Sequence, residues 1–98
     1  MAKFVYIYTG GGIPESEEEG KRQLEKWQAF LGGFGDKLVD MGAPFGPSKS
    51  VTGNGTATKA TGYSVISAGS LDEAVKLAKA CPIFQGGGNV EVYEALEM

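Results

Sequence analysis

The segment of residues 3–8 limits the possible folds more than any other part of the chain. It is dense in β-forming residues and stops at the glycine-rich turn of residues 9–12. Side chains alternate between the two faces of a strand, and here both faces are apolar. One face carries Phe4, Tyr6 and Tyr8, and the other carries Val5 and Ile7. Such a strand is typical of the middle of a sheet that is covered on both sides.

A capping box predicts that a helix follows this strand. Ser16 is the expected N-cap and Glu19 stands three residues later, in a run of acidic residues that suits the positive end of a helix dipole. Apolar residues then recur at spacings of three and four: Leu24, Trp27, Leu31, Phe34, Leu38 and Met41. Glycines interrupt this stripe. We expect one long helix, with room for a kink at the glycines, that ends near Gly42.

The second half of the chain predicts two strands, a short helix and a last strand. Residues 43–68 hold the two strands, joined by the turn signal at residues 53–55. The first is an edge strand because its two prolines lack a ladder donor, and the second covers residues 61–68. A second capping box at residues 70–73 begins the short helix. The last strand covers residues 90–93.

This order of elements is βαββαβ, which predicts an α+β, ferredoxin-like fold. The antiparallel sheet has four strands and both helices lie on one of its faces, because β-α-β crossovers are right-handed. We expect the aliphatic residues of the central and last strands to face the helices: Val5, Ile7, Val90 and Val92. The other face would present Phe4, Tyr6, Tyr8 and Tyr93. An uncovered aromatic face must bind a second subunit, a ligand or nucleic acid.

Composition narrows the choice of partner and compartment. The 98 residues suit one domain, and the net charge of −3 with a single arginine opposes nucleic-acid binding. The apolar run at the N-terminus is too short for a signal peptide or a membrane span. We therefore expect a cytoplasmic protein without a membrane or nucleic-acid partner. One cysteine and no histidine cannot build a zinc site, and no cofactor motif is present.

Several short motifs occur in order along nearly the whole chain: Trp27 and residues 38–47, 62–66, 70–74, 81–84 and 90–92. With these motifs the sequence resembles the YCII-related domain family, in the subgroup named for an Asp-Gly-Pro-Phe-like motif. The resemblance implies one ferredoxin-like domain over residues 1–98. It also implies a homodimer whose sheets pair across the interface, as in the dimeric α/β barrels.

The resemblance leaves open whether the chain is an enzyme. Some family members look like enzymes in which a histidine and an aspartate face a cleft between sheet and helix. This chain has no histidine, and Cys81-Pro82 stands where members tend to carry His-Pro, so a His–Asp acid–base pair cannot operate here. Cys81 is the one catalytic candidate. We interpret it as a buried structural cysteine, because it follows a helix whose dipole raises a thiol pKa.

The tyrosines of the strands are the candidate ligand-binding residues. Tyr6, Tyr8 and Tyr63 would form the walls of a cavity between the sheet and the partner subunit. Lys49 and Glu91 would supply its polar groups. The alternative is that these tyrosines pack in the dimer interface without contacting a ligand.

Three functions follow from these observations. The first is a small-molecule binder or cofactor-independent enzyme of the dimeric α/β-barrel type. The second is a non-catalytic accessory or regulatory domain that binds another protein. The third is an RNA-recognition module, which has the same βαββαβ order. The acidic balance opposes RNA, and residues 62–66 lack the second aromatic that such a module needs.

Overall fold

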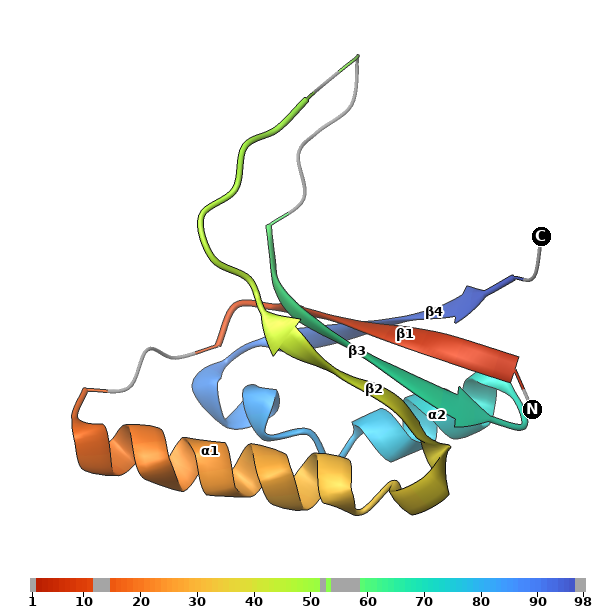
Figure 1. Ribbon diagram of the computed structural model, residues 1–98, viewed down its shortest axis with the longest axis horizontal. Coiled ribbons are helices and arrows are strands. Elements are labelled where there is room, and N and C mark those ends of the chain that lie inside the picture. The colour runs from red at the N-terminus through yellow and green to blue at the C-terminus, as the bar shows by residue number, and fades with distance from the viewer. Residues whose placement is uncertain (1, 12–14, 52, 54–58, 97–98) are drawn as a thin grey trace.

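Four strands and two α-helices follow one another in the order βαββαβ in the computed structural model, which describes residues 2–11, 15–51, 53 and 59–96 (Figure 1). The elements are β1 (Ala2–Thr9), α1 (Glu17–Gly32), β2 (Leu38–Pro44), β3 (Ala60–Ala68), α2 (Leu71–Ala78) and β4 (Asn89–Ala95), with short 3-10 helices η1 (Gly35–Lys37) and η2 (Pro82–Gly86). The predicted ferredoxin-like α+β fold is confirmed. Neither described α-helix is long and apolar enough to cross a membrane.

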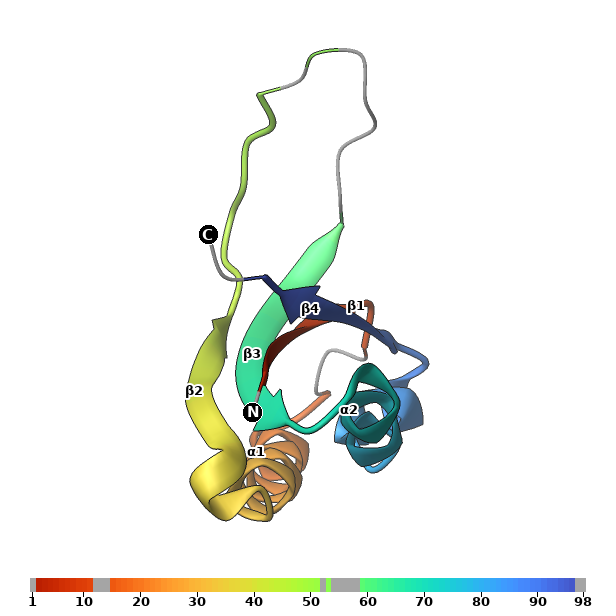
Figure 2. The same ribbon diagram turned by 90° about the vertical axis from the view of Figure 1, so that its right-hand side faces the viewer.

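The four strands form one antiparallel sheet in the order β2-β3-β1-β4. The predicted central position of β1 is confirmed. The edge strand is β2, but it is formed by Leu38–Pro44 and not by the proline-containing segment after residue 43 that the sequence predicted. Both α-helices lie on the same side of the sheet, and Figure 2 shows the opposite side free of helices. We call this uncovered side the open face.

The sequence-based assignment of the two sheet faces is wrong for β1. Phe4, Tyr6 and Tyr8 are buried under the helices, whereas Val5 and Ile7 lie on the open face and are only half-buried. Strand pairing carries the same alternation across the sheet, so the open face also holds Tyr63, Val65, Glu91 and Tyr93. The expected position of Tyr93 is confirmed, since 53% of its surface is exposed.

Hydrogen bonding explains why the tyrosines lie under the helices. The Tyr6 hydroxyl donates to the backbone carbonyl of Ala74 in α2 at 2.6 Å, and the Tyr8 hydroxyl donates to Ser64 at 2.9 Å. A buried hydroxyl is costly only when it lacks a partner, so these rings are buried without that penalty. Val90 and Val92 pack against the same core, as the sequence predicted.

The first helix is shorter than the sequence predicts. It ends at Gly32, and the next residue of the helical stripe, Phe34, leads into η1. Gly35 has a φ of +56°, a conformation that favours glycine and turns the chain towards β2. Leu38 and Met41, assigned above to the helix, therefore belong to β2. This strand ends at Pro44, before most of the segment in which the sequence predicted it.

Both predicted capping boxes begin their helices. Ser16 accepts a hydrogen bond from the backbone N–H of Glu19 and Ser70 accepts one from Glu73, each at 3.1 Å. The second helix and the last two strands match their predicted ranges to within a few residues. The predicted turn at Gly53-Asn54-Gly55 falls largely outside the described residues.

Gly42 fixes how closely β2 approaches β3. Its φ is +76°, its N–H donates to the Asp40 carboxylate at 2.8 Å, and a Cβ built on it would lie 1.6 Å from the carbonyl oxygen of Tyr63. The pairing of β2 with β3 shifts register on both sides of Asp40. Only glycine combines this backbone conformation with this close contact, so Gly42 sets the position of the residues that follow it in β2.

Gly42→Ala should destabilise the protein by about 3 kcal/mol or more, because a left-handed backbone and a backbone clash add together. Gly35→Ala is the matched control. It also has a positive φ, but a Cβ there meets nothing within 4 Å, so it should cost only about 1 kcal/mol. Urea unfolding measures both variants. Equal losses of stability would contradict the close approach of β2 to β3.

Candidate functional site: a groove between α1 and the sheet

The apolar side of α1 is progressively less buried towards the N-terminus of the helix. Leu31 is buried, Trp27 is half-buried, and Leu24 has 57% of its surface exposed. These residues belong to one stripe at helical spacing, so they share a side of the helix. The helix is therefore packed at its C-terminal end and leaves apolar surface uncovered at its N-terminal end.

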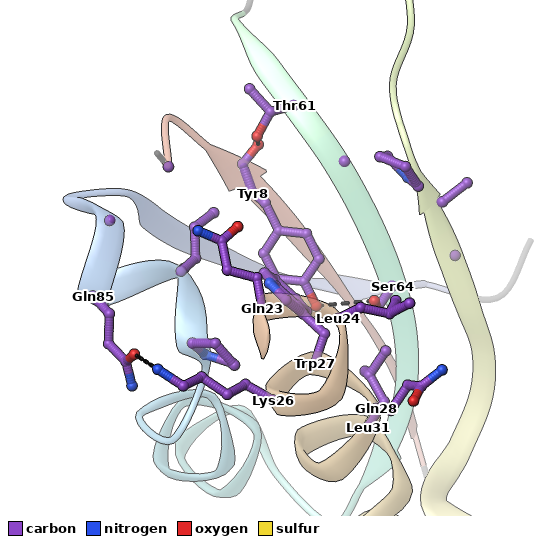
Figure 3. Close-up of a pocket in the computed structure, with 18 of the residues that line it drawn as sticks. Tyr8, Gln23, Leu24, Lys26, Trp27, Gln28, Leu31, Thr61, Ser64 and Gln85 are labelled. Carbon is purple, nitrogen blue, oxygen red and sulfur yellow. Dashed lines mark hydrogen bonds between the residues drawn. The ribbon is translucent and has the colours of Figure 1, made fainter. Parts of the chain in front are cut away.

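A groove of about 1070 Å³ lies along this uncovered part of α1. Its walls are α1, the C-terminal end of β2, the facing part of β3, and η2 (Figure 3). Most of the lining is apolar. The ring of Tyr8 lies against the groove and packs edge-on against Trp27, with ring centroids 4.9 Å apart. A large apolar cavity with a few polar groups is the usual form of a small-molecule site.

Two hydroxyls in the groove wall form a hydrogen-bonded chain. The Tyr8 hydroxyl donates to Ser64 Oγ at 2.9 Å, and the Ser64 hydroxyl donates to the backbone carbonyl of Met41 at 2.7 Å. Tyr8 and Ser64 are 5% and 1% exposed. Burial, partly opposed by the bond to Ser64, raises the pKa of Tyr8 to about 12. Tyr8 is therefore a neutral phenol at physiological pH.

The charged groups of the groove come from one side of α1. Within the described lining, the side chains that carry charge at neutral pH are Glu19, Arg22 and Lys26. Lys26 Nζ donates to the side chain of Gln85 in η2 at 2.8 Å and so joins two walls of the groove (Figure 3). Arg22 and Lys26 are exposed, so they sit at the entrance.

The structure brings together two of the five ligand-binding residues that the sequence suggested. Tyr8 and Tyr63 both line the groove, but Tyr63 alternates onto the open face of β3, and its ring stacks on Phe45. Tyr6 is buried against α2, Lys49 lies exposed in the segment after β2, and Glu91 lies on the open face of β4 and accepts a hydrogen bond from Tyr93.

The groove lies on the helix side of the sheet and not on the side where the sequence analysis placed a cavity. That expectation followed from putting the tyrosines on the uncovered face. The reasoning missed Leu24, Trp27 and Ser64. Trp27 and Leu24 were visible in the helical stripe, but nothing in the stripe shows that the N-terminal end of the helix is not packed against the sheet. Ser64 carried no signal, because a single serine in a strand does not show which hydroxyl or carbonyl it will contact.

Cys81 lies outside the groove lining, directly after α2. Cys81 is 3% exposed, and burial raises the pKa of its thiol to about 11. A buried, protonated thiol fits the structural role proposed above, although burial and not the helix dipole is the main cause of the raised pKa. No group of three or more Cys, His, Asp or Glu able to hold a metal occurs in the described part of the chain.

The fold is similar to that of 5-chloro-2-hydroxyhydroquinone dehydrochlorinase (TftG) from Burkholderia phenoliruptrix AC1100, solved in complex with 2,5-dihydroxybenzoquinone. The TM-score is 0.60, and the two chains are 18% identical over 98% of this chain and 95% of that chain. TftG has the YCII-related dimeric α/β-barrel fold. At this identity the likeness shows the fold alone. No family model matches the sequence, and no curated protein is significantly similar to it.

The raised pKa of Tyr8 predicts a loss of stability at alkaline pH. The folded protein keeps the Tyr8 proton up to about pH 12, whereas a phenol with the ordinary pKa of 10.0 loses it in the unfolded chain. The folded state thus binds more protons between these values, so the free energy of unfolding should fall as pH rises from 10 to 12. Urea unfolding at a series of pH values measures this slope.

Tyr8→Phe should make that fall less steep, because the variant has no phenol to titrate at this position. At neutral pH the variant should be about 1 kcal/mol less stable, since Ser64 loses a hydrogen-bond partner. Well below pH 10.0, the ordinary pKa of a tyrosine, Tyr8 keeps its proton in both the folded and the unfolded state, so the two proteins should show parallel pH profiles. Identical slopes between pH 10 and 12 would contradict a raised Tyr8 pKa.

Proposed function

We propose that this protein binds a small, mainly apolar molecule in the groove between α1 and the sheet. The exposed apolar stretch of α1 carries this proposal. Leu24 is more than half exposed although it continues the stripe that forms the core, and it faces a cavity of about 1070 Å³. Covering that surface is favourable at about 25 cal/mol per Å². A ligand in the groove supplies the cover that the sheet does not.

The size and shape of the groove suit a compact ligand. Small-molecule sites occupy roughly 300–1,000 Å³, so this groove is slightly larger than that range and holds a molecule of one or two rings with space remaining. The edges and faces of Trp27 and Tyr8 suit a planar or aliphatic body. TftG, which shares the fold, was solved with a small ring compound, and this supports a ligand of similar scale.

Binding is better supported than acid–base catalysis. Tyr8 keeps its proton at neutral pH and Ser64 has no base beside it, because its hydrogen bonds run to Tyr8 and to a backbone carbonyl. Among the charged groups of the described lining, Arg22 and Lys26 are exposed, and the half-buried Glu19 carboxylate already accepts hydrogen bonds from the backbone N–H of Glu15 and the side chain of Gln23. A general base needs a pKa near the working pH and contact with the reacting atom. We therefore propose no proton-transfer step.

We further propose that two copies of the chain pair through the open face, as in a dimeric α/β barrel. Val5 and Val65 are direct partners at the centre of this face, and Ile7, Tyr63 and Tyr93 surround them. A four-stranded sheet with helices on one side leaves this apolar surface in water. The sequence analysis also argued that an uncovered sheet face needs a second subunit. That argument still applies, but the residues of this face are mainly aliphatic and not mainly aromatic.

The open face also favours the alternative function, a domain that binds another protein. A second copy is the better candidate, because the face is apolar at its centre and the chain supplies the same surface twice. If the protein is monomeric in solution, a different protein is the better candidate for covering the open face.

Leu24→Glu should weaken binding of the uncharged probe N-phenyl-1-naphthylamine by about fivefold, because it removes roughly 1 kcal/mol of apolar contact. Leu71→Glu is the matched control. Leu71 is an exposed leucine in the first turn of α2, outside the groove, so its substitution should leave binding unchanged. Probe fluorescence measures both. Failure of the wild-type protein to bind the probe would contradict an apolar binding groove.

Val65→Lys should convert a dimer at micromolar concentration into a monomer, because it places a charge at the centre of the proposed interface. Val75→Lys puts the same charge on an exposed position of α2 and should stay dimeric. Sedimentation velocity measures the mass, and circular dichroism checks that both variants fold. A monomeric wild-type protein would overturn the proposed interface.

A further inference from the structure

We propose that the groove selects ligands that carry an uncharged hydrogen-bond donor, such as a phenol or an alcohol, and disfavours anionic groups and ketones. This inference rests on the proposed function and identifies the chemical class of the ligand. It follows from the direction of the hydrogen bonds at Tyr8, which the groove wall fixes.

The backbone carbonyl of Met41 determines that direction. A carbonyl oxygen can only accept, so the hydroxyl of Ser64, 2.7 Å away, must donate its single proton to it. Ser64 can then only accept from Tyr8, whose hydroxyl lies 2.9 Å from Ser64 Oγ. The proton of Tyr8 is therefore used inside the wall. What Tyr8 retains for a ligand is a lone pair of its hydroxyl oxygen.

The burial of this chain makes its direction persistent. Ser64 is 1% exposed, so water cannot readily replace either of its hydrogen-bond partners, whereas Tyr8 lines the groove, where a ligand can reach it. The backbone carbonyl at the end of the chain has no proton to give and does not titrate. Tyr8 itself remains protonated throughout the neutral range. The wall thus presents an acceptor to the groove at every physiological pH.

An acceptor in an apolar groove discriminates between ligands by their own hydrogen-bonding groups. A neutral hydroxyl donates to the Tyr8 oxygen and leaves nothing unpaired. A ketone brings a second lone pair against the first, and a carboxylate adds the cost of removing a charge from water. Trp27 and Leu24 next to Tyr8 favour an apolar body behind the hydroxyl. Figure 3 shows this arrangement, with the Tyr8 hydroxyl directed at Ser64 beside Leu24 and Trp27.

Three probes of similar size test the proposal: 4-ethylphenol, 4-ethylacetophenone and 4-ethylbenzoate. Trp27 is the only tryptophan and lies in the groove wall, so its fluorescence reports binding of each. The wild-type protein should bind the phenol about tenfold more tightly than the ketone, the value of one net hydrogen bond, although the ketone has more apolar surface. The benzoate should bind more weakly than the phenol by at least the same factor.

Two serine variants separate the hydrogen-bond direction from general packing. Ser64→Ala removes the internal acceptor and frees the Tyr8 proton for a ligand, so the preference for the phenol over the ketone should fall to about twofold or less. Ser67→Ala is the matched control. Ser67 lies on the same strand and also donates to a backbone carbonyl, that of Lys37, but it is outside the groove. Its ratio should equal that of the wild-type protein.

The outcomes distinguish a failure of the proposed function from a failure of this inference alone. If the wild-type protein binds none of the three probes and also fails to bind the uncharged naphthylamine, the proposed function is wrong and this inference falls with it. If it binds the naphthylamine but binds the ketone or the benzoate as tightly as the phenol, only this inference is overturned. An unchanged ratio in Ser64→Ala would overturn it as well. Thermal unfolding confirms that the variants are folded.

Discussion

The burial of the tyrosine side of β1 beneath the two helices is the constraint on which the rest of the structure depends. Tyr6 reaches the backbone of α2 and Tyr8 reaches Ser64 in the neighbouring strand, so each ring is held at its outer end by a hydrogen bond. The large rings occupy the space between the sheet and the helices. Phe34 and Leu31 fill this space at the C-terminal end of α1, where both are buried. The groove lies at the other end of the apolar stripe, where Leu24 is exposed.

The order of elements could be predicted from the sequence because it depends on local signals. Both capping boxes, the β-rich segments and the turn residues act within a few positions of one another, and the resulting fold is confirmed. The faces of β1 could not be assigned in the same way. Phe4, Tyr6 and Tyr8 alternate with Val5 and Ile7, and both sets are apolar, so alternation alone gives two equal solutions. The choice between them depends on acceptors in α2 and β3, which are distant in sequence.

The end of α1 shows a second limit of periodic patterns. Leu38 and Met41 continue the spacing of the stripe beyond Phe34, but the glycines between them cost helix stability and allow the positive φ that turns the chain. The groove depends on the same event. Because the helix ends at Gly32, the residues from Met41 to Pro44 are free to form an edge strand, and that strand becomes a wall of the groove. A helix continuing to residue 41 would remove that wall.

The close approach of the β2 and β3 backbones determines the space and the hydrogen bonds of the groove wall. A Cβ at Gly62 would lie 3.1 Å from the carbonyl oxygen of Ala43 and 3.5 Å from the ring of Tyr8, so a larger residue there would push β2 away or fill the space beside the ring. The backbones are closer still at Gly42, where a Cβ would lie 1.6 Å from the carbonyl oxygen of Tyr63. The approach of β2 to β3 brings the Met41 carbonyl within reach of Ser64, and that carbonyl fixes the direction of the chain that ends at Tyr8. The hydrogen-bonding character of the groove is thus a consequence of backbone packing between two strands, and a side chain added at either glycine would alter it by pressing on Tyr8 or Ser64.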